Sequence, residues 1–98
     1  MNKRTKATNI SLSTKQIVWE RDNHQCIICH SPYAFPNAHY VSRAYGGLGV
    51  ERNVVTLCPN CHNLMDNSPR RKELKAIVKR YLQRLYDDWN EEELIYKK

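Results

Sequence analysis

The sequence predicts a small α+β domain held together by a zinc ion. Three observations predict it: two Cys-x-x-Cys pairs, a short β-branched apolar segment just before the second pair, and a long run of helical apolar spacing after it. A chain of 98 residues suffices for one domain, and chains of this size often need a metal or disulfides to supplement a modest core. We expect a single domain over residues 13–98 and, because residues 1–12 are polar and basic, a disordered arm before it.

The four cysteines form two pairs, Cys26/Cys29 and Cys58/Cys61. Each pair presents two thiolates from one tight turn, so two turns complete a tetrahedral zinc site. No apolar run has the length of a signal peptide or of a membrane span, which leads us to expect a cytoplasmic protein with no membrane partner. In that reducing compartment such pairs are more often zinc ligands than disulfides. A redox pair, two disulfides, or a mixed site that uses His24 or His30 are the alternatives.

Positive charge is concentrated in two segments of the chain, whose net charge is +6. Residues 1–15 carry four bases and no acid, and residues 67–86 carry seven bases and one acid. Basic segments on both sides of a nearly neutral centre fit a polyanion, with nucleic acid as the first candidate partner. An ordinary solvated surface that serves solubility is the alternative.

The first ordered element is expected to be a short helix from about residue 14 to residue 22. Ser13, followed three residues later by Gln16, has the pattern of a capping box. A hairpin with a long connection should follow, with strands at about 38–42 and 53–57. The glycine-rich segment between them is unsuited to the interior of a helix or strand, so it should be a loop.

Two helices are expected after the hairpin. In the first, over residues 61–66, His62 and Asp66 are four residues apart and so share a face. The second should open with Ser68 as its N-cap and Pro69 at its first position. Its apolar residues follow 3.6-residue spacing, which predicts an amphipathic helix packed on the core: Leu74, Ile77, Val78, Tyr81, Leu82, Leu85, Tyr86 and Trp89.

The residues between the first cysteine pair and Asp66 resemble the HNH endonucleases, whose ββα-metal core is a hairpin followed by a helix. The resemblance covers about residues 17–66, which we take as the core, with residues 68–98 as a helical extension. Its motif is a Cys-x-x-Cys pair followed by His39, Gly46-Gly47, Asn53 and Leu57-Cys58-x-x-Cys61-His62. The pattern is most similar to small stand-alone HNH proteins of phages and prophages, some encoded beside packaging genes, which implies the cytoplasm of a bacterial host.

The resemblance implies metal-dependent hydrolysis of phosphodiester bonds in DNA. His39 matches the general base, and an imidazole with a pKa near 6.5 suits that role at neutral pH. Asn53 matches the residue that fixes the hairpin loop. His62 matches a ligand of the catalytic divalent cation, Mg²⁺ or else Mn²⁺ or Ni²⁺, and Asp66, one turn further on, would be its second ligand. The cysteines would hold a separate structural Zn²⁺.

One position departs from the family pattern. Many members carry Asp or His directly before the base as a further metal ligand, and here that residue is Ala38. Two classes of function therefore remain open: a DNA nickase or endonuclease, and a zinc-stapled module that binds DNA without cleaving it or assists a phage terminase or another DNA-processing protein. In either case the expected DNA contacts are basic: Arg43, Lys72, Lys75 and Lys79.

Overall fold

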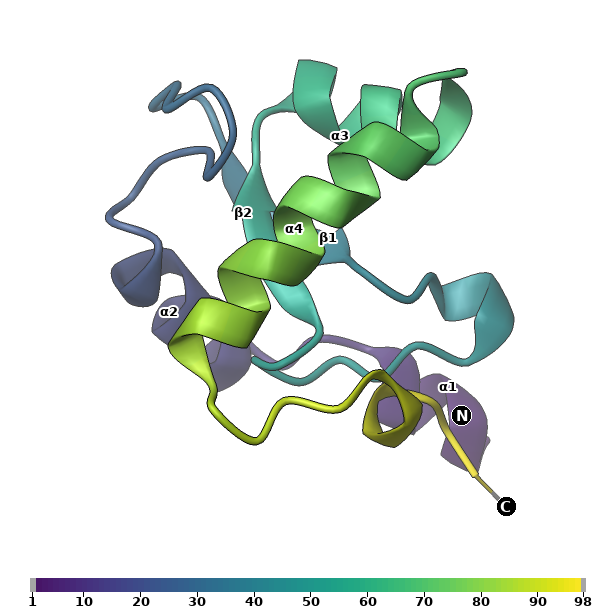
Figure 1. The fold of residues 1–98 in the computed structure, drawn as a ribbon. Helices are drawn as coiled ribbons and strands as arrows, with labels where there is room; N and C mark the ends of the chain where they lie inside the picture. Colours follow the sequence, from purple (N-terminus) through teal and green to yellow (C-terminus); the bar gives the residue numbers. More distant parts are fainter. Residues whose placement is uncertain (1, 98) are drawn as a thin grey trace.

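The computed structural model describes residues 2–97. Its elements, with η marking a 3-10 helix, are α1 (Lys3–Thr8), α2 (Leu12–Arg21), β1 (Phe35–His39), η1 (Arg43–Tyr45), β2 (Val54–Leu57), α3 (Pro59–Asn67), α4 (Arg71–Leu85) and η2 (Glu91–Leu94). Over this part of the chain the strands form a two-stranded antiparallel sheet. In Figure 1, α4 crosses in front of the hairpin, and α2 packs against both strands on its other side. The small α+β fold is therefore confirmed.

The hairpin places the two faces of β1 in different surroundings. Ala38 pairs with Val55, and His39 pairs with Val54. Ala38 and Val55 are fully buried in the main core, whereas His39 lies on the opposite face of the strand and is half-buried. All four residues of β2 are buried because helices cover both faces of that strand. β1 lies three residues earlier in the chain than the sequence predicts, so His39 is its last residue rather than its second.

The long amphipathic helix is present as α4. Leu74, Val78 and Leu82 recur every fourth residue and are buried against the hairpin and α3. The helix ends at Leu85, and the side chain of Leu85 is exposed instead of packing on the core as its spacing predicts. Beyond that end, Trp89 still packs on the core. No helix within residues 2–97 is long and apolar enough to cross a bilayer.

Two helices begin at other residues than the sequence predicts. In α2 the N-cap is Ser11, whose hydroxyl accepts a hydrogen bond from the backbone of Thr14, so the helix begins two residues early. Ser68 ends α3, where its hydroxyl donates to the carbonyl of Leu64 at 2.6 Å, and the same hydroxyl accepts from the backbone N–H of Arg70 at 3.1 Å. The next helix then begins only at Arg71. Local capping patterns identified the right regions but not the residue that caps.

The first residues also differ from the disordered arm that composition predicts. Residues 3–8 form α1, and the side chain of Asn2 caps it by accepting a hydrogen bond from the backbone of Thr5 at 2.7 Å. Six residues are too few for a helix to be stable alone in water. The arm is ordered because it packs against the loop between the strands, a contact that a sequence pattern does not reveal.

A buried carboxylate links three elements of the frame. Asp22, at the end of α2, accepts hydrogen bonds from the backbone N–H of Thr56 at 2.8 Å and from the hydroxyl of Tyr81 at 2.6 Å. Arg21 pairs with the same carboxylate at 2.7 Å. Because each partner comes from α2, β2 or α4, losing the carboxylate would leave several buried donors unpaired. This network fixes the hairpin between the two helices.

Candidate metal centre and histidine pocket

The four cysteines meet at one end of the hairpin. Their Sγ atoms all lie within 4.8 Å of one another, and those of Cys29 and Cys58 are 3.5 Å apart. A tetrahedral zinc ion with Zn–S bonds of about 2.3 Å places its sulfur ligands about 3.8 Å apart. The cluster therefore has the composition and the spacing of a site that could hold a structural metal such as zinc.

Backbone donors support thiolates in this cluster. The N–H of Cys29 points to the Sγ of Cys26 at 3.5 Å, and the N–H of Cys61 points to the Sγ of Cys58 at 3.3 Å. Burial alone would raise the pKa of Cys26, but backbone N–H groups, chiefly those of Cys29 and Cys58, outweigh it and lower this pKa to about 7. The thiolate, which is the form that binds metal, is thus accessible near neutral pH at Cys26, whereas burial raises the pKa of Cys61 in the absence of a metal.

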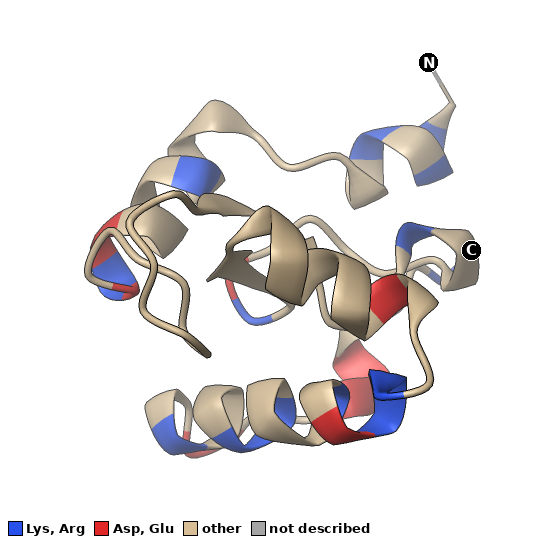
Figure 2. Cartoon of the chain, turned by 90° about the horizontal axis from the view of Figure 1, so that it is seen from above, with Lys and Arg blue, Asp and Glu red and all other residues tan. Residues whose placement is uncertain are grey.

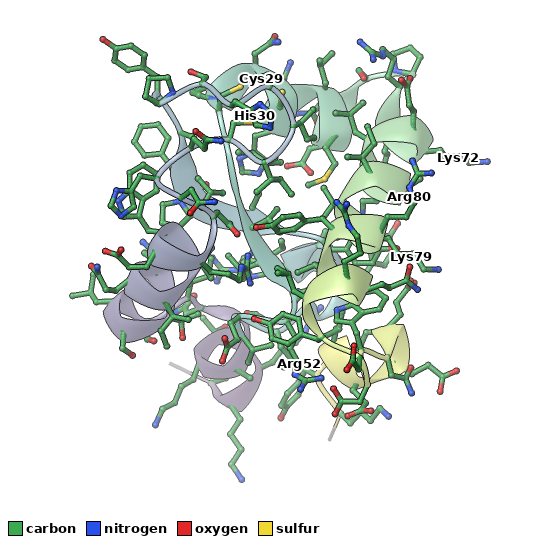
Figure 3. The ribbon with its side chains drawn as sticks, turned by 60° about the vertical axis from the view of Figure 1, so that its left-hand side comes forward. Cys29, His30, Arg52, Lys72, Lys79 and Arg80 are labelled. Atoms are coloured by element: carbon green, nitrogen blue, oxygen red, sulfur yellow. The ribbon has the colours of Figure 1, made fainter. Side chains whose placement is uncertain are left out.

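The two histidines near the first cysteine pair, His24 and His30, lie outside the cluster. The ring of His24 stacks on Trp19 with centroids 5.0 Å apart and pairs with Glu20 at 3.0 Å. His30 is exposed in a left-handed backbone conformation with φ of 66°. In Figure 3, Cys29 and His30 lie near the top of the view, in the turn that carries the first cysteine pair. The geometry favours four cysteine ligands over a mixed set.

His39 ends β1, and its ring is held by a backbone carbonyl. Its Nε2 lies 2.9 Å from the carbonyl oxygen of Thr8, and since a carbonyl can only accept, Nε2 carries the proton. Burial lowers the pKa of His39 below its usual 6.5, and the positive charge of Arg43 lowers it further; the bond to Thr8 acts in the opposite direction. The imidazole is therefore neutral at pH 7, with Nδ1 unprotonated.

Asn53 is fully buried and fixes the loop that follows β1. Its side-chain oxygen accepts from the N–H of Val41 at 2.8 Å, and its amide donates to the carbonyls of Val41 at 3.1 Å and Leu48 at 2.9 Å. In addition, its own carbonyl accepts from the backbone N–H of Tyr40 at 2.7 Å. These bonds define the direction of the chain directly after His39.

His62 and Asp66 form a pair on the outer face of α3. Nε2 of His62 lies 3.1 Å from Oδ2 of Asp66, with side chains 30% and 42% exposed. Adjacent ligands of an octahedral cation with bonds of 2.0–2.1 Å lie about 3 Å apart, so the pair fits two neighbouring coordination positions. After burial, the bond to Thr8 and the charge of Arg43, the pKa of His39 is also lowered by His62 and raised by Asp66. Among residues 2–97, however, the four cysteines alone bring three or more potential ligand side chains together.

Strand alternation explains why Ala38 does not complete this pair. Ala38 points into the core, whereas Asn37 shares the face of His39. Asn37 lines a pocket of about 400 Å³ beside His39. Sequence reasoning passed over this residue, although the two-residue period of a strand through His39 would have indicated it.

The basic residues expected to contact DNA differ in how far their charged groups are already bonded within the protein. Lys75 is half-buried; its Nζ donates to the carbonyl of Tyr40 at 2.5 Å and lies 5.3 Å from the centre of that ring. Arg43 donates to the side chain of Asn9, and Lys79 lies 3.6 Å from Glu91. Figure 2 shows Lys and Arg along the side of α4 that faces away from the sheet, and Figure 3 shows Lys72, Lys79 and Arg80 projecting from this helix.

Comparison with known proteins adds no relative. No family model matches the chain, and no curated protein matches it either. What is established is a small α+β fold with a four-cysteine cluster that could hold a structural metal.

Proposed function

We propose that this protein is a metal-dependent DNA nuclease of the HNH kind that hydrolyses phosphodiester bonds. The observations that carry the proposal are a neutral histidine, held by one ring nitrogen at the end of β1, and a histidine–carboxylate pair on the next helix, α3. The order of these residues along the chain matches the family motif.

His39 has the properties of a general base. A base must be unprotonated at the working pH and must present a lone pair to the water that it activates. The bond to Thr8 occupies Nε2, which leaves Nδ1 free to accept a proton from water. Because its pKa is lowered, the acid limb of a pH–rate profile should fall below pH 6.5.

His62 and Asp66 are the residues that would hold a divalent cation, with one imidazole nitrogen and one carboxylate oxygen. Such a cation, when bound, stabilises the negative charge that develops on the phosphate. Mg²⁺ commonly takes one or two carboxylates and keeps several waters, while Mn²⁺ and Ni²⁺ accept imidazole more readily. Two protein ligands leave positions for water and a phosphate oxygen. Asn53 would keep the loop after His39 in place through its bonds to Val41 and Leu48.

The basic residues supply the attraction for DNA. Arg43 lines the pocket beside His39, and Lys72 and Lys79 extend the positive surface along α4. Lys75 is instead engaged by the carbonyl of Tyr40, so we assign it mainly to holding the hairpin. Contacts of this kind are to phosphates and largely independent of sequence.

A plasmid-nicking assay tests the proposal directly. Supercoiled DNA is incubated with the protein in Mg²⁺, in Mn²⁺, and without added metal. The wild type should nick only with metal, and His39→Ala should be slower by roughly 100- to 10,000-fold, as expected for loss of a general base. Zinc content and DNA affinity of His39→Ala should stay unchanged. Equal nicking by the two proteins at saturating metal would place the cleavage elsewhere and contradict the proposal.

A specific observation also favours a second function, a zinc-stapled module that binds DNA without cleaving it or assists a packaging machine. Ala38 faces the core, and within residues 2–97 no third protein ligand joins His62 and Asp66. Under this alternative the wild type binds DNA in a salt-dependent manner and nicks it no faster than His39→Ala at any metal concentration.

A further inference from the structure

We propose that the N-terminal segment, residues 2–10, is a built part of the His39 pocket and that the carbonyl of Thr8 is the group that orients the His39 ring. Composition alone suggests a different role, that of a charged tail which gathers DNA. The catalytic consequence rests on the proposed nuclease function, whereas the positioning of His39 does not.

The segment is attached to the loop after β1 by directed contacts. The guanidinium of Arg4 donates to the carbonyls of Ala44 at 2.9 Å and Arg43 at 3.3 Å. The backbone N–H of Gly49 donates to the carbonyl of Ala7 at 3.0 Å. These bonds join residues about 40 positions apart in the chain. They hold α1 against the loop instead of leaving it in solvent.

The fit at Gly49 is too close for any side chain. A Cβ atom at this position would lie 2.0 Å from the carbonyl oxygen of Asn9. Backbone therefore meets backbone where the segment crosses the loop, which is the circumstance that requires glycine. The segment consequently has one defined position over the loop.

In that position the segment reaches His39 and forms one wall of its pocket. Thr8 is buried, and its carbonyl accepts the only hydrogen bond that the structure gives the His39 ring within residues 2–97. The pocket of about 400 Å³ is lined by Asn9, Ile10, Lys15, Asn37, His39 and Arg43. Two of these residues, Asn9 and Ile10, belong to the N-terminal segment. Without the segment, His39 would lose both its hydrogen-bond acceptor and much of its burial.

The loop itself is also braced by the other end of the chain. The N–H of Leu48 donates to the carbonyl of Leu94 at 2.8 Å, and the N–H of Tyr96 donates to the carbonyl of Gly46 at 2.7 Å. Figure 1 shows α1 and the last described residues at the same end of the molecule. Displacing the N-terminal segment should therefore loosen the ring of His39 while the loop keeps its course.

Two variants displace the segment, and a third serves as a matched control. Arg4→Gln removes the guanidinium that grips the loop; Lys6→Gln removes the same charge from the same helix at an exposed residue. Gly49→Ala pushes the backbone of Asn9 away without changing any charge. Zinc content and circular dichroism report whether each variant folds.

The decisive measurement is the His39 Nε2–H proton in NMR spectra of the ¹⁵N-labelled full chain. A ring N–H bonded to Thr8 in a buried pocket exchanges slowly and should be visible in the wild type and in Lys6→Gln. It should exchange at least tenfold faster in Arg4→Gln and disappear in folded Gly49→Ala. In the nicking assay, Gly49→Ala should lower kcat by up to about 100-fold, as expected for a base misplaced by about 1 Å.

Each outcome has a defined meaning. An unchanged Nε2–H signal in both Arg4→Gln and folded Gly49→Ala overturns the proposal. If Gly49→Ala fails to bind zinc, the comparison of Arg4→Gln with Lys6→Gln decides alone. If the wild type cleaves no DNA but shows the protected signal and its loss in Arg4→Gln, the nuclease function fails while the positioning of His39 by Thr8 stands.

Discussion

The cysteine cluster and the candidate catalytic residues both draw on α3 but differ in completeness. The cluster brings four ligands from two turns into a mostly buried site with its own backbone donors. The candidate catalytic residues are two potential ligands on one exposed helix turn and a separate base on a strand. Structural metal sites are closed, while catalytic sites keep positions for water and substrate. The adjacent residues Cys61 and His62 belong one to each, so a metal in the cluster would also fix the start of the helix that carries His62.

Because the cysteine cluster has the composition of a closed structural site, losing one cysteine should unfold the chain. Apparent zinc-binding energies of structural sites are on the order of 10 kcal/mol, as large as the whole stability of a domain of this size. Cys58→Ser should therefore lose zinc and its cooperative thermal transition. Elemental analysis and circular dichroism of freshly purified protein check both.

His30→Asn is the matched control for that experiment. Asn tolerates the left-handed backbone found at His30, and this side chain lies outside the cluster, so one zinc per chain and an unchanged melting temperature are expected. Zinc loss in His30→Asn would instead indicate a mixed cysteine–histidine site. Cys58→Ser with full thermal stability would show that the cluster is no structural centre at all.

A carboxylate placed on either face of β1 tests which face meets the candidate catalytic residues. Ala38→Asp restores the residue type that many HNH proteins carry before the base, but here the new carboxylate would enter the core beside Val55. A buried, unpaired charge should destabilise the fold by about 3–5 kcal/mol without lowering the metal concentration needed for nicking. Chemical denaturation measures the first effect, and metal titration of nicking measures the second.

Asn37→Asp introduces the same group one residue away, on the exposed face that lines the pocket. Its free energy of unfolding should stay within about 0.5 kcal/mol of the wild type. If Ala38→Asp proved equally harmless and also reduced the metal requirement, β1 would present the opposite face to the site, and the pocket would be assigned to the wrong side of the strand.

Local patterns in the sequence were enough to predict the elements that carry the two sites. The Cys-x-x-Cys spacing, the β-branched segment and the 3.6-residue period each depend on near neighbours, and the cysteine cluster, the hairpin and α4 all follow from them. The sequence also placed His62 and Asp66 on one face of a helix, and the structure brings them within 3.1 Å.

The features missed depend on distant parts of the chain. The bond from His39 to Thr8, the contact of Gly49 with Asn9, and the burial of Lys75 all join segments more than 30 residues apart. The sequence also left open on which side of the sheet Ala38 lies. Alternation along a strand fixes which residues share a face, whereas packing by distant elements decides which face is covered.

Substituting His62 or Asp66 should raise the metal concentration that cleavage needs, whereas loss of His39 should not be rescued by more metal. His62→Ala and Asp66→Ala should raise the Mn²⁺ concentration for half-maximal nicking by at least the roughly 10- to 100-fold that loss of an outer-shell partner costs. High Mn²⁺ should partly rescue both variants but not His39→Ala, which lacks the proton acceptor. Asn63→Ala, exposed on the same helix, should match the wild type. Failure of Mn²⁺ to rescue either variant would argue against this pair as the cation site.

The smallest expected effect separates a basic residue that contacts DNA from one that holds the frame. Lys72 is exposed on α4, so Lys72→Ala should reduce the slope of log affinity against log salt by about 1 and leave stability unchanged. Lys75→Met should instead lose the bond to Tyr40 and destabilise the fold by about 1–2 kcal/mol, with little change in slope. DNA titrations at several salt concentrations, together with denaturation curves, measure both quantities. Because each substitution removes one charge from the same helix, equal changes in slope would mean that Lys75 leaves Tyr40 to reach the phosphate, and its assignment to the frame would then be wrong.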